Sequence, residues 1–137
     1  MEMTRGKWVL SAVVALLVCL GLAYAWGASG RFALQRTLDE TRQQLDLAEA
    51  RGLILDARVS LYNLNFGEAS QALEGAKAPL RRVRERYQEA RRSDAALSIE
   101  SAIRHVEEAQ RLANKLDPAA NGTAGEALEA IRVATSR

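Results

Sequence analysis

The sequence predicts an all-α protein, in which a single N-terminal transmembrane helix precedes a small antiparallel helical bundle with a long first helix. Three observations predict this fold class. The N-terminal region contains an uncharged apolar stretch, apolar residues recur three and four positions apart through the rest of the chain, and no segment alternates with the two-residue period of a β-strand. With 137 residues and a net charge of +2, the chain suits one small domain, and its charge is too low to indicate a nucleic-acid partner.

The apolar stretch covers residues 8–26, after a short tail at residues 1–7. At 1.5 Å per residue it makes a helix of about 28 Å, close to the roughly 30 Å of a hydrocarbon core. Trp8 at one end, and Tyr24 with Trp26 at the other, are typical of membrane interfaces. We therefore expect a signal anchor that crosses a bacterial inner membrane once and leaves the bundle on the periplasmic or extracellular side.

The same stretch also fits a cleaved secretory signal peptide. Arg5 and Lys7 form a basic region before it, and Ala23-Tyr24-Ala25 is a small-x-small triplet that allows cleavage after Ala25. A retained anchor and a released protein therefore both remain open. If the span is retained, small residues in it are candidates for packing against a partner transmembrane helix: Ser11, Ala15, Gly21 and Ala25.

A short joint at residues 27–30 leads into the helical domain, residues 31–137, whose first helix we expect at about 31–65. Apolar and small residues recur there at alternating spacings of four and three, which is the rhythm of a coiled coil. We expect this seam to face the rest of the bundle. Its members are Leu34, Leu38, Thr41, Leu45, Ala48, Gly52, Leu55, Val59, Tyr62 and Phe66.

Three shorter helices are expected at about 68–92, 94–116 and 124–135. Pro79 predicts a kink or short break in the first of these, because proline lacks a backbone donor and clashes with the preceding turn. Ser93 and Asp94 are good N-cap residues for the next helix, and Thr123 to Glu126 match a capping box for the last. The inward residues are expected to be Ala69, Leu73, Ala76, Leu80, Val83, Tyr87 and Ala90, then Ile99, Ala102, Val106, Ala109, Ala113 and Leu116, then Leu128, Ile131 and Ala134.

The turn between the long first helix and the helix expected at 68–92 carries a local pattern. Residues 65–76 read NFGEASQALEGA, with the aromatic Phe66, the small Ala69, the bulky Leu73 and the small Ala76 as a hairpin core. This segment resembles the turn and second helix of a tetratricopeptide-type hairpin. The resemblance implies a helical surface that binds other proteins.

A basic run lies at residues 77–92, where lysine and arginine clearly outnumber the acidic residues. One interpretation is an interaction surface for anionic lipid or an acidic partner. The other is a solvated helix face whose arginines pair with acids of the first helix, or with Glu107 and Glu108. The candidate residues are Arg81, Arg82, Arg84, Arg86, Arg91 and Arg92.

The sequence contains no pattern that predicts catalysis. His105 is the only histidine, and it has no cysteine near it and no well-spaced carboxylate partner for a metal. We therefore expect no enzyme activity, no catalytic or metal-binding residues and no cofactor. The expected function is that of a membrane-anchored scaffold or accessory subunit that docks onto a larger membrane protein assembly. The alternative is a secreted or periplasmic protein-binding module. The expected partners are the lipid bilayer and a protein of that assembly, and the seam also allows a homo-oligomer.

Overall fold

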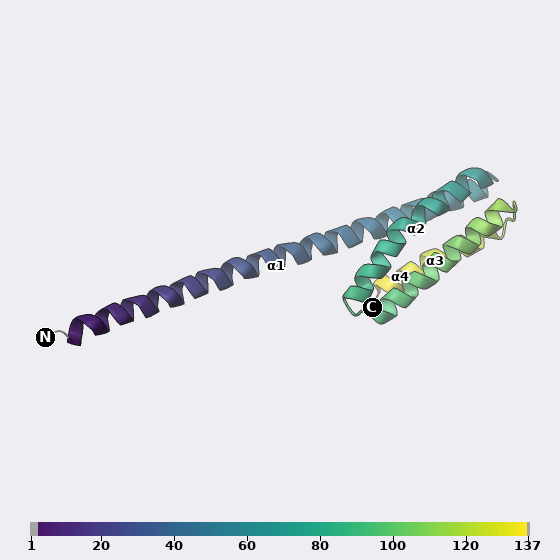
Figure 1. The fold of residues 1–137 in the computed structure, drawn as a ribbon. Helices are drawn as coiled ribbons and strands as arrows, with labels where there is room; N and C mark the ends of the chain where they lie inside the picture. The colour runs from purple at the N-terminus through teal and green to yellow at the C-terminus, as the bar shows by residue number, and fades with distance from the viewer. Residues whose placement is uncertain (1–2, 137) are drawn as a thin grey trace. The chain divides into compact units, whose positions relative to one another are not determined.

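The computed structural model describes the backbone of residues 3–136 and the side chains of residues 13–24 and 34–136. The described chain is all-helical, with α1 at Met3–Tyr62, α2 at Phe66–Glu89, α3 at Ser93–Asn114 and α4 at Ala120–Thr135 (Figure 1). It divides into two compact units, Met1–Glu40 and Thr41–Arg137. The predicted helical bundle is confirmed, and it lies in the second unit.

The first unit consists of the N-terminal part of α1. Among the residues that the structure describes, no helix offers a run long and apolar enough to cross a membrane. The transmembrane helix predicted at residues 8–26 is therefore not supported by the described residues. The side chains of Trp8, Ser11, Ala25 and Trp26 lie outside the described residues. The backbone at residues 27–30, predicted to be a joint, is helical.

In the second unit, each helix runs antiparallel to the next one in the chain, as polar contacts between helices show. Asp46 of α1 pairs with Arg82 of α2, and Glu74 of α2 accepts a hydrogen bond from Gln110 of α3. His105 of α3 lies 3.2 Å from Glu126 of α4. Helix α4 also contacts α1, so the four helices form a closed bundle. The Arg58 Nε of α1 donates to Asn121 Oδ1 of α4 at 2.9 Å, and the Asn121 side chain donates back to the Arg58 carbonyl.

The face that α1 turns to this bundle is not the predicted seam. The core contains Leu47, Ala50, Ile54, Ala57 and Leu61, which have the same heptad spacing. Leu45 and Leu47 are two residues apart, so they point about 200° apart around the helix. The predicted seam is therefore on the opposite, outward side. Its larger members in this unit are well exposed: Leu45 by 64%, Leu55 by 50%, Val59 by 61% and Tyr62 by 83%.

On the other helices the predicted inward faces are largely confirmed. Every expected residue of α2 from Ala69 to Tyr87 is buried, and so is every expected residue of α3 from Ile99 to Ala113. The exceptions lie at helix ends, where Ala90 caps α2 and Leu116 follows α3 in the turn. Leu128 of α4 is half-buried at the edge of the core. Periodicity therefore located these faces, but it overran those of α2 and α3 by one residue at the C-terminal end.

Alanine dominates the core and sets its spacing. Fully buried alanines occur on all the helices of the bundle, among them Ala57, Ala76, Ala109 and Ala127, between fewer large residues such as Ile54, Leu73, Ile99 and Ile131. Small side chains at the contact let helix axes approach at the short end of the usual 8–10 Å range. The bundle is consequently held by close packing of backbones more than by large apolar side chains.

The three connections share one turn geometry, in which a non-glycine residue adopts a left-handed conformation. Leu64, Arg91 and Leu116 have φ values of 61°, 57° and 57°. In each turn the following amide donates to a carbonyl five residues back: Asn65 to Ser60 at 2.8 Å, Arg92 to Tyr87 at 2.8 Å and Asp117 to Leu112 at 3.0 Å. This is the Schellman motif, which pairs carbonyls left free at a helix end.

Two helix features differ from what the sequence indicates. Helix α2 continues through Pro79, which is fully buried, so of the predicted kink or short break the break is absent, and core packing offsets the lost backbone hydrogen bond. The capping box at Thr123 to Glu126 does not start α4. That helix begins at Ala120, and the Thr123 hydroxyl instead donates to the carbonyl of Ala119. Asn65, by contrast, does cap α2, since its side chain accepts from the Glu68 amide.

Candidate functional site

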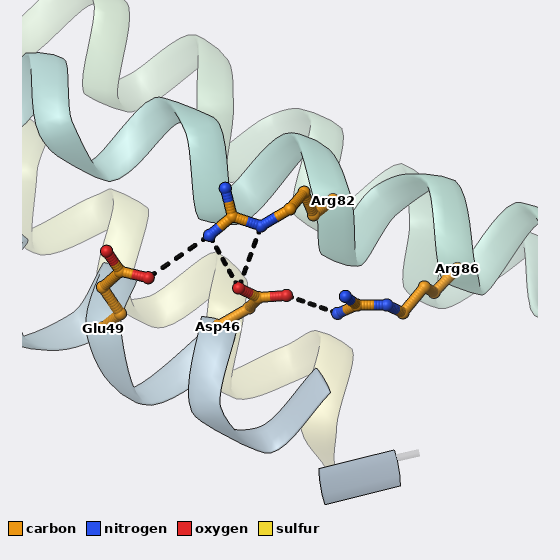
Figure 2. Close-up of polar contacts among 4 residues, drawn as sticks. All are labelled: Asp46, Glu49, Arg82 and Arg86. Atoms are coloured by element: carbon orange, nitrogen blue, oxygen red, sulfur yellow. Dashed lines mark hydrogen bonds and ion pairs between the residues drawn. The ribbon is translucent and has the colours of Figure 1, made fainter. Parts of the chain in front are cut away.

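A cluster of four charged side chains joins α1 to α2 (Figure 2). Asp46 lies between two arginines that are one turn apart on α2. Its Oδ1 accepts from Arg82 Nε at 3.0 Å and from Arg82 Nη2 at 2.7 Å, while its Oδ2 accepts from Arg86. Arg82 Nη2 also lies 3.3 Å from the exposed carboxylate of Glu49. Asp46 is only 8% exposed, so this cluster is the most buried charged contact described.

The electrostatics of Asp46 favour its ionised form. Burial raises the pKa of its carboxyl, but the hydrogen bonds and positive charges of Arg82 and Arg86 outweigh burial and hold the pKa below its ordinary value. The same hydrogen bond raises the pKa of the Arg82 guanidinium. The cluster is therefore a fixed ion pair that clamps two helices, and not a group poised to exchange protons near neutral pH.

Of the remaining arginines in the basic run, Arg81, Arg84 and Arg92 also have partners within the bundle. Arg81 Nη2 lies 3.6 Å from Glu107, and Arg84 Nη1 lies 2.5 Å from Glu100, both on α3. Arg91 occupies the left-handed position in the turn after α2, and the Arg92 guanidinium lies 4.6 Å from the centre of the Tyr87 ring. Glu108, expected to accept an arginine of the run, pairs instead with Arg111 on its own helix.

A shallow hollow lies near the α2–α3 turn. It has a volume of about 360 Å³ and is lined by Arg84, Gln88, Ser93, Ala96, Leu97 and Glu100. Arg84 Nε, at its wall, is buried and has no hydrogen-bond partner in the described structure. The one charge pair in the hollow, Arg84 with Glu100, is satisfied internally. The opposite charges of Arg84 and Glu100 therefore neutralise each other at the wall of the hollow.

The predicted hairpin core lies inside the bundle. Ala69, Leu73 and Ala76 are fully buried, and Phe66 packs half-buried against the core. These residues hold α2 against the rest of the bundle, and the three that are fully buried are not accessible to a partner. Of the candidate membrane-packing residues, Ala15 and Gly21 are exposed on α1, whereas the side chains of Ser11 and Ala25 lie outside the described residues.

Asp46 was not identified from the sequence as a candidate residue. It lies next to Leu47 and one turn before Ala50, so it falls on the face that enters the core. The sequence does contain a signal for this ion pair. It is an acidic residue on the face that enters the core, together with two arginines four residues apart on the next helix. His105 forms a surface contact with Glu126, and no group of three or more potential metal ligands occurs among the described residues.

Comparisons of the chain with protein-family models, with curated proteins and with solved structures found no significant match. The function must therefore be inferred from the chain's own residues.

Proposed function

We propose that this chain is a non-enzymatic docking protein, whose helical bundle is held at a bacterial inner membrane by the N-terminal apolar segment and binds a protein of a larger membrane assembly. The observation that carries the proposal is the character of residues 13–24. The large apolar side chains of this stretch are 50–83% exposed, and they point to all sides of α1. A helix that is apolar all round requires an apolar environment around it.

The bundle fits a passive binding role better than a catalytic one. Four arginines of α2 are engaged in ion pairs with α1 and α3: Arg81, Arg82, Arg84 and Arg86. Such pairs stabilise the arrangement of helices and leave no activated nucleophile, general base or bound group among them. The proposed role of the bundle is to present helix surfaces to a partner at the membrane.

Membrane attachment is tested by fractionation of the native protein. If the apolar segment is a retained anchor, the protein stays with membranes after carbonate and high-salt washing, and its intact mass includes residues 8–25. Protease added to spheroplasts digests the bundle if that domain faces outward. Protection there, with digestion in inverted vesicles, would place the bundle in the cytoplasm and reverse the proposed orientation.

The second candidate function is a secreted or periplasmic protein-binding module. The triplet Ala23-Tyr24-Ala25 favours it, because this pattern permits cleavage after Ala25. A soluble product that begins at Trp26 would establish the second candidate and exclude the anchor. Partner binding is tested in either case by purification in mild detergent and identification of the co-purifying proteins.

A further inference from the structure

A second apolar surface runs along α1 on the side that faces away from the bundle. We call it the outer stripe and define it by the six exposed residues Leu45, Ala48, Gly52, Leu55, Val59 and Tyr62. Their spacings alternate between three and four, so they occupy the a and d positions of three successive heptads. The core face of the same helix is already filled by α2 and α4, whereas these six residues are exposed in the single chain.

The length of the stripe sets it apart from scattered surface leucines. Single exposed apolar residues are common on folded proteins and need no explanation. Apolar a and d positions sustained over three to four heptads are instead typical of a coiled-coil interface. Leu34 and Leu38, both exposed, extend the same spacing by one heptad in the sequence.

Gly52 gives a second reason to expect another helix on this face. A Cβ atom added at Gly52 would meet nothing within 4 Å, so packing inside the chain does not require glycine there. Glycine in an exposed helix interior is unfavourable relative to alanine. Together with Ala48, one turn earlier on the same face, it forms a narrow place where a neighbouring backbone can approach closely.

We propose that the outer stripe is the interface of a parallel two-stranded coiled coil formed with a second copy of this chain. The charges that flank the stripe support this occupant. In the heptad register of the stripe, Arg51 is at a g position and Asp56 is at the following e position. Parallel pairing places Arg51 of one chain beside Asp56 of the other, and symmetry repeats the attraction on the other side.

The same residues disfavour the antiparallel alternative. If two copies pair head to tail with Ala48 opposite Gly52, each Glu49 lies opposite its own copy, and so does each Arg51. Like charges directly opposite one another are destabilising. Arg51 also donates to Thr135 Oγ1 at 3.0 Å, a contact that uses one of its five N–H groups and leaves others for the second copy. Parallel pairing is independent of membrane attachment, but it keeps both N-termini at one end.

Self-association of the full chain in mild detergent tests the proposal. The wild-type chain is expected to sediment as a dimer at micromolar concentration. The double variant Leu55→Glu with Val59→Glu is expected to raise the dimer dissociation constant at least tenfold and to keep the helicity and melting temperature of the bundle, because both side chains are exposed in the single chain. The matched control is Leu97→Glu with Leu116→Glu, two leucines equally exposed but off the stripe, and it is expected to dimerise like wild type.

Cysteine cross-linking tests the direction of pairing. In a Cys19→Ser background, Leu55→Cys is expected to form a disulfide-linked dimer with itself, because a parallel pair brings identical positions together. Ala78→Cys, on an exposed face of α2, is expected not to. Cross-linking of Leu55→Cys only with Leu45→Cys would show antiparallel pairing and overturn the proposal.

The self-association experiment can also overturn the proposal. A monomeric wild-type chain would do so, and so would a dimer that is insensitive to both stripe substitutions. Loss of a different co-purifying protein on stripe substitution would assign the stripe to that protein.

Discussion

At the scale of single residues, Asp46 is the side chain whose removal the bundle tolerates least among its charged groups. It is almost fully buried and holds two arginines, whereas the neighbouring Glu49 is exposed and lies 3.3 Å from Arg82 only. Removing one partner of a buried ion pair leaves the others uncompensated, although the exposure of Arg82 moderates this effect. Asp46 is therefore a structural residue that fixes how α2 lies against α1.

Asp46→Asn is expected to lower the free energy of unfolding by about 1–2 kcal/mol, because the neutral amide keeps the shape but loses the charge. Glu49→Gln is the matched control and is expected to change it by less than about 0.5 kcal/mol, as exposed pairs do. Urea unfolding of both variants, followed by circular dichroism, measures the difference. Equal effects of the two substitutions would contradict the structural role assigned to Asp46.

The pH dependence of stability follows from the lowered pKa of Asp46. In the unfolded chain an aspartate titrates near about 3.9. The stabilisation is therefore complete above that pH, and it is lost as the pH falls through the lower pKa of the folded state. The pKa values of the exposed Glu74 and Glu108 are also lowered, so their contributions to stability likewise decrease as the pH falls. The difference in unfolding free energy between wild type and Asp46→Asn is thus expected to shrink below about pH 4, and a constant difference would contradict this.

At the scale of the helices, each of the three turns contains a non-glycine residue in an unfavourable backbone conformation. Leu64, Arg91 and Leu116 occupy left-handed conformations, which disfavour residues with a Cβ atom by roughly 1–2 kcal/mol relative to the right-handed helix. Glycine is the usual residue at this position of a Schellman motif. Each turn nevertheless keeps its hydrogen bonds, so helix packing on both sides holds it.

Leu116→Gly is expected to stabilise the bundle by about 0.5–1 kcal/mol, because glycine adopts this conformation readily and the Leu116 side chain is exposed. Leu97→Gly is the contrasting control, since Leu97 is equally exposed but lies inside α3. That control is expected to destabilise by about 1 kcal/mol, which is the helix-interior penalty of glycine. Thermal and urea unfolding measure both changes, and a destabilising Leu116→Gly would count against the turn assignment.

The alanine-rich core makes the helix contacts sensitive to added volume. Ala102→Leu places three extra carbons where α3 meets its neighbours, and it is expected to cost about 1–3 kcal/mol through overpacking. Ala78→Leu adds the same volume on an exposed face of α2 and is expected to change stability by less than about 0.5 kcal/mol. Urea unfolding of both variants measures the two changes in stability. Equal effects would show that the core accommodates the larger side chain without overpacking.

At the scale of the whole molecule, a binding role of the basic run can be tested separately from its contribution to stability. Replacing Arg81, Arg84 and Arg91 with glutamine is expected to leave helicity unchanged and to lower stability by no more than about 1–2 kcal/mol, because the Arg81 pair is long and exposed and the Arg84 pair is half-exposed. Circular dichroism measures the first effect, and co-purification tests whether the variant still binds the proposed membrane partner. Loss of the partner with the fold intact would identify the run as a binding surface.

The sequence by itself determined that the chain is helical, where the turns fall to within a few residues, and which faces of α2, α3 and α4 point inward. These features depend on local periodicity and on turn residues such as Asn65, which act within a few positions of themselves. Tertiary structure alone decided which side of α1 enters the core. Its two apolar stripes share one heptad period and differ only in direction, so periodicity cannot rank them. The choice depends on the close packing that Ala50 and Ala57 allow and on the ion pair of Asp46 with α2, both of which are contacts between residues far apart in the chain.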